Sequence, residues 1–192
     1  GDVCTRSCRF CATSTGKPQA PNADEPKRVA ESVKLMKLRH CVITSVTRDD
    51  LPDGGAQHWH NTIVEVKRVN PTTKVEVLIP DFNGVTQEID KVLLAKPDIV
   101  AHNLETVERL TPSVRSRASY KKSLGVIAHI AKKGYLAKSG LMVGLGEEMA
   151  EVEKAMDDLI NVGCRAITIG QYLQPRGENL PVSKFIEPEV FQ

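Results

Sequence analysis

Three cysteines near the beginning of the sequence are spaced closely enough to act on one metal centre. Cys4, Cys8 and Cys11 follow the pattern C-x3-C-x2-C, and no fourth cysteine lies nearby. Iron–sulfur clusters are normally held by four protein ligands. Three cysteines on one loop therefore predict a cluster with one iron left open for a substrate or cofactor, much as catalytic zinc sites keep an open position. A structural zinc ion, a disulfide and chance clustering are the alternatives.

The rest of the sequence predicts strands that alternate with helices. Short runs of mostly β-branched, uncharged residues indicate strands at 40–46, 74–79, 98–102, 138–145 and 166–171, with a sixth expected before Gly1. Apolar periodicity and end signals indicate helices at about 24–36, 86–95, 119–133 and 147–162. A further helix is expected between the polar turn at 47–55 and about Val69. Such strands, buried on both faces, form a parallel sheet covered by helices. The pattern fits an open doubly wound sheet or a partial TIM-type barrel, and both place chemistry at the carboxyl ends of the strands.

Polar side chains gather where two of these strands end. Thr44 and Ser45 lie at the end of the first strand, and Asn103 and Glu105 follow the third; all four are candidate cofactor contacts. Since Asn103 and Glu105 stand two apart on extended backbone, both side chains are predicted to point to the same side. An amide beside a carboxylate suits a bound ammonium group or ribose hydroxyls. The alternative for Glu105 is the start of a helix, where a carboxylate is also stabilising.

Composition and charge narrow the class of protein. The 192 residues, 41% hydrophobic and 26% charged, predict one soluble globular domain over 1–192. A formal net charge of +2 gives no argument for binding nucleic acid, and no apolar run is long enough to span a membrane. Crowded cysteines indicate a reducing compartment, either the cytoplasm or an organelle matrix. Because the sequence lacks a starting methionine, we expect a fragment of a longer protein.

The cysteine loop also carries a family resemblance. The run CTRSCRFC at 4–11 resembles the cluster loop of radical S-adenosylmethionine (SAM) enzymes and is similar to the CTRxCxFC loop of the lipoyl synthase family. The segment from Gly140 to Glu147 resembles the GxIxGxxE motif of radical SAM enzymes, which helps to frame the adenine. Five segments are similar to lipoyl synthase blocks in the same order: HCVITSVTRDDLPDGGAQHW, PDIVAHNLETVERL, VRSRASY, KSGLMVGLGE and TIGQYLQP. The resemblance implies an α/β fold, the partial (β/α)6 TIM-type barrel of radical SAM enzymes, truncated at both ends.

The resemblance also implies cofactors. In the family, the three thiolates hold a 4Fe–4S cluster, and SAM chelates the fourth iron through its amino and carboxylate groups. An electron from the cluster then splits SAM into methionine and a 5′-deoxyadenosyl radical. Carried over by position, this implies that Asn103 and Glu105 contact SAM, that Arg115 pairs with its carboxylate, and that backbone near Tyr172 and Leu173 holds its adenine. The alternative for Arg115 is a solvated charge on a helix.

The family's activity is insertion of sulfur at C6 and C8 of a protein-bound octanoyl chain, which makes the lipoyl cofactor. The implied partners are octanoylated lipoyl carrier domains of 2-oxoacid dehydrogenase subunits and the glycine cleavage carrier protein, with an electron donor such as flavodoxin or ferredoxin. Neither nucleic acid nor a membrane is expected as a partner. Two alternatives stay open, namely a radical SAM enzyme with another product and a non-catalytic metal-binding module.

Two features depart from the family pattern. Lipoyl synthases bind a second, auxiliary 4Fe–4S cluster through motifs that are missing here, so we expect this cluster only in the full-length protein. Cys41 and Cys164 lie where strands begin, far from the cysteine loop, and are predicted to be buried core thiols. In the segment 174–182, the residues at 176–179 (RGEN) replace the serine and histidine common in the family.

Three histidines are predicted to be structural. His58 and His60 stand two apart on a predicted helix, so their side chains diverge and do not form a metal-ligand pair. His102 ends a predicted strand, where it can line a site, but a core position is the preferred interpretation.

Overall fold

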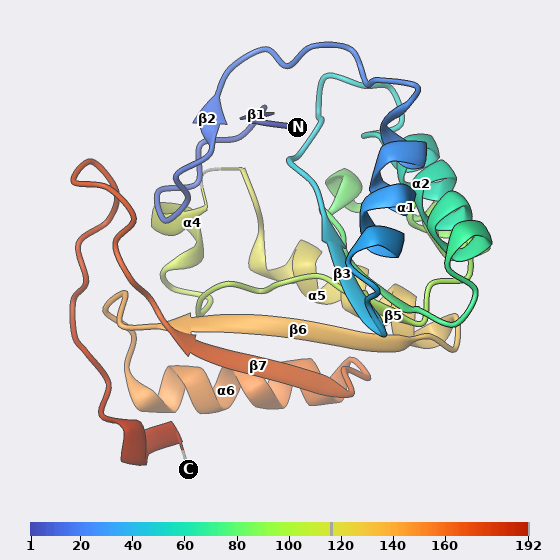
Figure 1. Cartoon of the computed structure of the whole chain (residues 1–192). Helices are drawn as coiled ribbons and strands as arrows, with labels where there is room; N and C mark the ends of the chain where they lie inside the picture. The colour runs from blue at the N-terminus through green and yellow to red at the C-terminus, as the bar shows by residue number, and fades with distance from the viewer. Residues whose placement is uncertain (116, 192) are drawn as a thin grey trace.

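The computed structural model describes residues 1–115 and 117–191. Its main sheet has parallel strands whose order in space equals their order in the chain (Figure 1). These strands are β3 (His40–Thr44), β4 (Lys74–Leu78), β5 (Ile99–Ala101), β6 (Leu136–Val143) and β7 (Ala166–Gln171). A doubly wound sheet reverses its strand order, whereas the order β3 to β7 runs in one direction. The sheet curls into part of a β/α barrel, which confirms the partial-barrel prediction.

Helices connect the strands and cover the outer face of the sheet (Figure 1). The longer ones are α1 (Glu25–Leu35), α2 (Ala56–Val69), α3 (Thr86–Leu94), α5 (Tyr120–Lys132) and α6 (Met149–Asn161). Each of them lies where the sequence predicted it. The remaining helical segments are short: η1 (Phe82–Gly84), α4 (Thr111–Val114) and η2 (Pro188–Phe191).

The helix ends follow local signals in the sequence. Gly134 and Gly163 follow α5 and α6 with φ values of 82° and 87°, a left-handed conformation that costs glycine little. The hydroxyl of Ser119 accepts a hydrogen bond from the Lys122 N–H at the start of α5. Asp24 precedes α1 as predicted, but its side chain makes no capping hydrogen bond.

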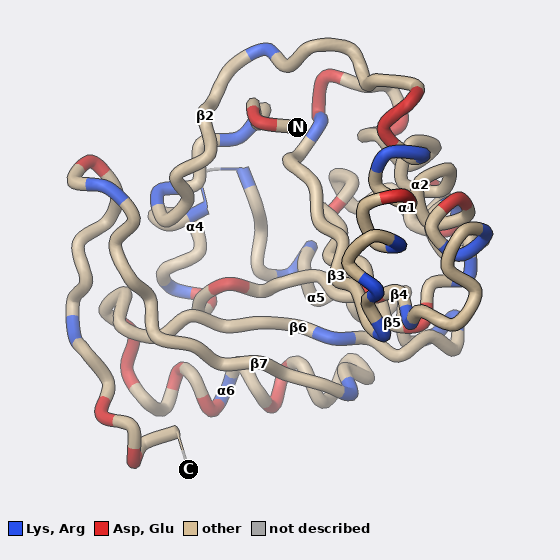
Figure 2. The backbone as a smooth tube through the Cα atoms, viewed as in Figure 1, with Lys and Arg blue, Asp and Glu red and all other residues tan. Residues whose placement is uncertain are grey.

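The hydrophobic core lies between the sheet and its helices. Because side chains alternate along a strand, every second one faces the helices. The fully buried residues of this layer include Ile63, Val66, Val75, Val77, Ile89, Val100, Ile127, Ile130 and Leu159. Charged residues lie mainly on the helices and connections (Figure 2).

One detail of the predicted core is wrong. The strands are not all buried on both faces, since Val42 in the edge strand β3 is 58% exposed. Met36, the last residue of the helix predicted at about 24–36, follows α1 and is exposed. In the described part of the chain, no helix is both long and apolar enough to cross a membrane.

The cysteine loop begins and ends in a small separate sheet. β1 (Val3–Cys4) pairs in parallel with β2 (Ser14–Thr15), so the base of the loop is closed by strand pairing. This pairing could not be predicted, because strands of two residues are too short to show a periodic pattern. Figure 1 shows β1 and β2 above the carboxyl ends of the main strands.

Candidate cofactor site

A cavity of about 420 Å³ opens at the carboxyl ends of β3 to β5, against the cysteine loop. It brings together most of the residues that the sequence singled out as candidate ligands or cofactor contacts. The predicted site residues on its wall are Cys4, Cys8, Cys11, Thr44, Ser45, Asn103, Glu105 and Arg115. Segments more than 100 residues apart in the sequence therefore meet at one end of the sheet, where parallel β/α folds place their chemistry.

The three cysteines of the loop are free thiols that affect one another electrostatically. Cys4 and Cys8 are half-buried and Cys11 is exposed. Burial raises the pKa of the Cys8 thiol; the charge of Arg115 opposes this rise, and the nearby Cys4 and Cys11 add to it. Among the described residues, no three His, Cys, Asp or Glu side chains converge on the position of a single metal ion. A cubane cluster instead distributes its thiolates over separate irons.

Backbone N–H groups donate hydrogen bonds to two of the cysteine sulfurs. The Arg6 N–H donates a hydrogen bond to Cys4 Sγ at 3.4 Å, and the Thr13 N–H donates one to Cys11 Sγ at 3.4 Å. The Cys11 N–H donates to the Cys8 carbonyl at 3.1 Å and closes a turn between these two residues. Hydrogen bonds to the sulfurs tune the reduction potential of a bound iron–sulfur cluster.

Arg6 anchors the cysteine loop to the main sheet, a role that the sequence did not reveal. Its guanidinium is buried and donates to Asp49 at 2.8 Å through both Nε and Nη2. It also donates to Asp81 through Nη1 at 2.9 Å and through Nη2 at 2.7 Å. Burial alone would raise the pKa of the Asp81 carboxyl, but Arg6 lowers it to about 2. Since Asp49 follows β3 and Asp81 follows β4, one side chain joins the loop to both strand ends.

Asn103 and Glu105 lie side by side as predicted, but the predicted backbone is wrong. Glu105 has a φ of 68°, in the left-handed region, and no helix begins there. Its backbone bridges to β6 through the Glu105 N–H, which donates to Gly140 O at 2.9 Å. Burial raises the pKa of the Glu105 carboxyl, whereas Arg115 and a hydrogen bond with Asn103 lower it.

Gly140 leaves room for the Asn103 side chain. A Cβ on Gly140 would lie 2.9 Å from Asn103 Oδ1 and 3.0 Å from Asn103 Cγ, both shorter than real Cβ contacts. The glycine that opens the predicted GxIxGxxE-like segment is therefore required here by close packing against a cavity residue.

Arg115 is not a solvated helix charge, because its side chain is buried and the residue is only 8% exposed. Its Nη1 donates to the carbonyls of Asn103 and Leu104 and to Ser123 Oγ, each at 3.2 Å. Its Nε is buried and has no hydrogen-bond partner among the described residues. A buried donor without a partner is costly, and the Arg115 residue as a whole lines the cavity.

His102 is linked to Arg115 through Ser123, whose hydroxyl group bonds both side chains. Burial, and then the charge of Arg115, lower the pKa of His102 to about 4, so the ring is neutral at pH 7. Its Nδ1 lies 2.9 Å from Ile79 O and its Nε2 lies 3.0 Å from Ser123 Oγ. With Nδ1–H donating to the carbonyl, Nε2 accepts from the Ser123 hydroxyl, which in turn accepts from Arg115. The predicted core position of His102 is correct, although the residue also lines the cavity.

Tyr172 and Leu173 do not line this cavity. Tyr172 is buried, and its hydroxyl donates to Leu180 O at 2.7 Å. Leu173 is 66% exposed. Both residues follow β7, and the sequence could place them at the correct edge of the sheet but could not show the path of the segment that leaves it.

The glycine-rich turn after β6 is held by a carboxylate. The N–H groups of Gly144 and Leu145 donate to the carboxylate of Glu147. Arg109 donates to Gly146 O at 2.9 Å and pairs with Glu151 at 2.7 Å, which fixes the other side of the turn. Glu147, the acidic residue of the GxIxGxxE-like segment, therefore stabilises the turn in which it lies.

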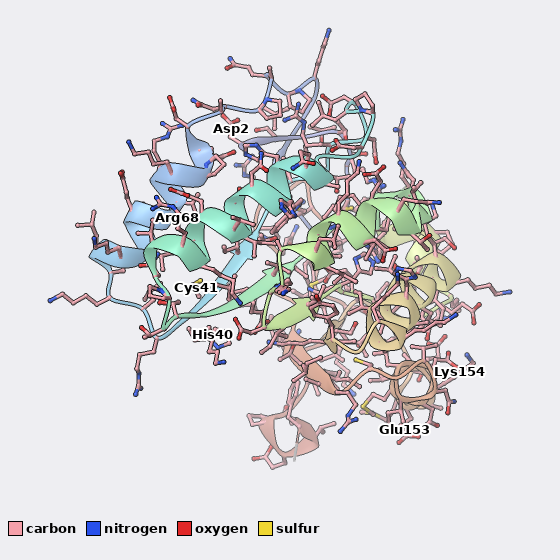
Figure 3. All side chains as sticks on the ribbon, turned by 90° about the vertical axis from the view of Figure 1, so that its right-hand side faces the viewer. Asp2, His40, Cys41, Arg68, Glu153 and Lys154 are labelled. Carbon is pink, nitrogen blue, oxygen red and sulfur yellow. The ribbon has the colours of Figure 1, made fainter. Side chains whose placement is uncertain are left out.

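Cys41 and Cys164 are buried core thiols, as predicted. Figure 3 shows Cys41 beside His40 at the beginning of β3, away from Asp2, which adjoins the cysteine loop in the sequence. The Cys164 thiol donates to Ala166 O at 3.3 Å within the core.

The donor set of the cavity fits an iron–sulfur cluster with a charged small-molecule ligand. Three thiolates are the ligand type that such clusters use. Glu105 and Arg115, a carboxylate and a guanidinium, line the same cavity.

Comparison with known proteins agrees with this geometry. The model of the radical SAM superfamily matches residues 1–159. Lipoyl synthase from Bacteroides fragilis (strain YCH46) is 61% identical over 191 residues, which cover 100% of this chain and 66% of that protein. Lipoyl synthase from Bacteroides thetaiotaomicron is 59% identical, with 100% and 68% covered. The chain thus spans about two thirds of the length of these relatives.

Solved structures with much lower identity show the same fold. Methylornithine synthase (PylB) matches with a TM-score of 0.73 at 14% identity, over 97% of this chain and 55% of that chain. Streptococcus suis SuiB bound to S-adenosylmethionine matches with a TM-score of 0.70 at 12% identity, over 96% and 42%. These structures share the fold, whereas the family model and the lipoyl synthase sequences establish that the chain belongs to the lipoyl synthase family of the radical SAM superfamily.

Proposed function

We propose that this chain is the cofactor-binding core of a lipoyl synthase. In this proposal Cys4, Cys8 and Cys11 hold a 4Fe–4S cluster, and SAM binds at the open iron. The whole protein inserts sulfur at C6 and C8 of a protein-bound octanoyl chain and so makes the lipoyl cofactor.

One observation carries the proposal most directly. The three cysteines share a single cavity with the half-buried Glu105 and with the Arg115 guanidinium. Thiolate ligands for a cluster thus lie near a carboxylate and a guanidinium that suit the ammonium and carboxylate of an amino acid. A structural zinc site would need the thiolates but not these two charged groups.

The residues of the cavity have separate tasks in this proposal. When bound, the cluster and SAM together supply a radical that abstracts hydrogen from unreactive C–H bonds. Arg115 orients the SAM carboxylate, since a guanidinium favours such charge-assisted hydrogen bonds. Glu105 and Asn103 hydrogen-bond the ammonium group or the ribose hydroxyls. Thr44 and Ser45 complete the polar wall at the end of β3.

The substrate and partners follow from the family. We propose octanoylated lipoyl carrier domains as substrates and a flavodoxin or ferredoxin as the electron donor. By resemblance to the family, we propose an auxiliary 4Fe–4S cluster in the full-length protein as the sulfur source. In this chain, Cys41 and Cys164 are buried and the other three cysteines are assigned to the first cluster. All five cysteines are free thiols, which suits a reducing compartment such as the cytoplasm or an organelle matrix.

Anaerobic reconstitution tests the proposed cluster. The 192-residue chain, incubated with iron and sulfide, is expected to develop broad absorption near about 400 nm from thiolate-ligated iron. Changing Cys4, Cys8 or Cys11 to Ala is expected to remove this absorption, because each thiolate holds one iron. Cys41→Ala and Cys164→Ala are the matched controls and should keep it. A colourless chain that retains zinc, or equal loss in the Cys164 variant, would contradict the proposal.

A further inference from the structure

The chain that follows β7 contacts both the glycine-rich turn and the cysteine loop. Figure 1 shows this segment running on the side of the cysteine loop before it reaches η2. The Ser183 N–H donates to Gly144 O at 2.8 Å, in the glycine-rich turn. The Leu180 N–H donates to Arg9 O at 3.0 Å, inside the cysteine loop. One segment therefore connects the turn after β6 with the cysteine loop.

Within this segment, the side chain of Asn179 forms hydrogen bonds to the cysteine loop. Its Nδ2 donates to the carbonyl of Arg9 at 3.1 Å and to the carbonyl of Cys11 at 3.0 Å. Its Oδ1 is buried and has no partner among the described residues. The NH2 group alone thus sets the orientation of this amide, and both of its protons are used on the loop.

The turn that presents Asn179 is braced by its own hydrogen bonds. Gln174 Nε2 donates to Gly177 O at 3.1 Å and to Asn179 O at 3.0 Å. The Asn179 N–H donates to Arg176 O at 3.0 Å. The Tyr172 hydroxyl fixes the next residue through Leu180 O at 2.7 Å. The backbone that carries Asn179 is therefore held by residues of its own turn and by Tyr172, whereas the side-chain amide bonds to the cysteine loop.

We propose that Asn179 is a positioning residue that fixes the third cysteine of the cluster loop. Cys11 is the most exposed of the three cysteines, and its carbonyl is tied to a segment 168 residues away. If this tie is lost, the stretch from Arg9 to Thr13 loses two hydrogen bonds to the rest of the protein. Asn179 belongs to the segment 176–179, where the sequence departs from the family pattern. In this proposal the segment serves to hold the cysteine loop. The consequence for the cluster rests on the proposed function, whereas the hold on the loop does not.

Amide hydrogen exchange of the metal-free chain tests whether Asn179 holds the cysteine loop in place. Asn179→Asp keeps the shape and the unpartnered oxygen but replaces the donor group with a second oxygen that faces two carbonyls. Amides in a peptide covering residues 7–13 are expected to exchange about tenfold faster in this variant, as expected for two lost hydrogen bonds. Peptides from β6 and α6 should be unchanged. The matched control is Glu178→Ala, because Glu178 neighbours Asn179 in the same turn and its side chain is 73% exposed.

A second variant keeps the test decisive if the aspartate disturbs folding. Asn179→Ala removes the same two hydrogen bonds without adding a charge. Faster exchange confined to residues 7–13 supports the proposal. Unchanged exchange there, or faster exchange spread evenly over the protein, overturns it.

Iron retention tests the consequence for the cluster. In the reconstituted chain, a chelator should remove iron about tenfold faster from Asn179→Asp than from the parent or from Glu178→Ala. If the parent chain takes up no cluster, the proposed function fails, while the exchange measurement still decides the role of Asn179. If the parent holds its cluster and the variant loses iron at the same rate, only the role of Asn179 in cluster retention is refuted.

Discussion

Arg6 and Asp81 form a buried bidentate ion pair, with nitrogen–oxygen distances of 2.7 and 2.9 Å. The pair joins the cysteine loop to the end of β4, and Asp49 holds the remaining side of the same guanidinium. No other side chain described here connects the loop to two strand ends at once. The stability of the loop should therefore depend on this arginine.

Replacing Arg6 is expected to destabilise the protein strongly. Arg6→Ala leaves two carboxylates facing each other without their cation, and breaking such a buried pair costs about 3–5 kcal/mol in the free energy of unfolding. Arg6→Lys should lose less, because it keeps the charge but not the planar fork. Urea unfolding of the metal-free chain measures both. Arg9→Ala is the control, since Arg9 is exposed in the same loop. Equal stability of Arg6→Ala and Arg9→Ala would contradict the anchoring role.

The same pair predicts a loss of stability in acid. The pKa of Asp81 is lowered from 3.8 to about 2 in the folded protein. A lowered pKa stabilises the fold above the unfolded value and ceases to do so as the pH falls through the folded value. The Asp81 contribution, about 2 kcal/mol, should therefore disappear between about pH 4 and pH 2. Unfolding curves over this range should show a smaller decline for Asp81→Asn, and parallel curves for the two proteins would rule out this contribution.

Glu105 is expected to act on SAM and not on the cluster. Glu105→Gln keeps the shape but removes the charge, so SAM binding should weaken by about 1–3 kcal/mol, as for a lost charge-assisted hydrogen bond. Iron content should not change. Equilibrium binding to the reconstituted chain measures the effect, with Glu108→Gln as the control because that side chain is 50% exposed. Unaltered affinity would leave Glu105 with only its role in joining the backbone to β6.

Gly140 should tolerate no side chain. In Gly140→Ala the new Cβ would displace Asn103 from its position beside Glu105, and such overpacking costs about 1–3 kcal/mol. SAM affinity should fall with stability, because Asn103 is the group that moves. Gly170→Ala, in β7, is a close control because a Cβ there meets nothing within 4 Å. Similar behaviour of the two alanine variants would mean that Asn103 adjusts without cost.

The 192-residue chain is expected to perform only the first half of the proposed chemistry. With SAM and a strong reductant, it should form 5′-deoxyadenosine, because the proposed cluster ligands and SAM contacts are present. It should form no lipoyl product from an octanoylated carrier domain, because its remaining cysteines, Cys41 and Cys164, are buried. Mass spectrometry of the carrier measures the product. Sulfur at C6 or C8, without another cluster protein in the mixture, would refute the assignment of the sulfur source to an auxiliary cluster.

Sequence patterns predicted the features that depend on neighbouring residues. The strands and helices follow from periodicity, and Gly134 and Gly163 end their helices through local conformational preference. The arrival of Asn103 and Glu105 at one cavity follows from parallel strands sharing one edge. Their expected extended backbone was wrong, because Glu105 adopts a left-handed conformation in order to bridge to β6.

Features that depend on distant residues could not be predicted in this way. Arg6 meets Asp81 across 75 positions of sequence, and nothing in either local pattern specifies the pairing. Asn179 reaches Cys11 through a loop whose path no periodicity determines. For the same reason the path of the chain beyond β7 could not be predicted; Tyr172 and Leu173 lie outside the cavity, and their contact with the adenine stays a prediction. A cysteine motif indicates the metal, but the groups that hold the motif in place come from the whole fold.

The ties made by Arg6 and Asn179 also fix the order of events during maturation. Both are hydrogen bonds between protein groups, so the cysteine loop loses its conformational entropy while the chain folds. In zinc fingers, by contrast, the metal drives folding and the apo form is disordered. Here the metal-free chain can reach its folded shape first, and the iron and sulfide then enter a loop that is already closed.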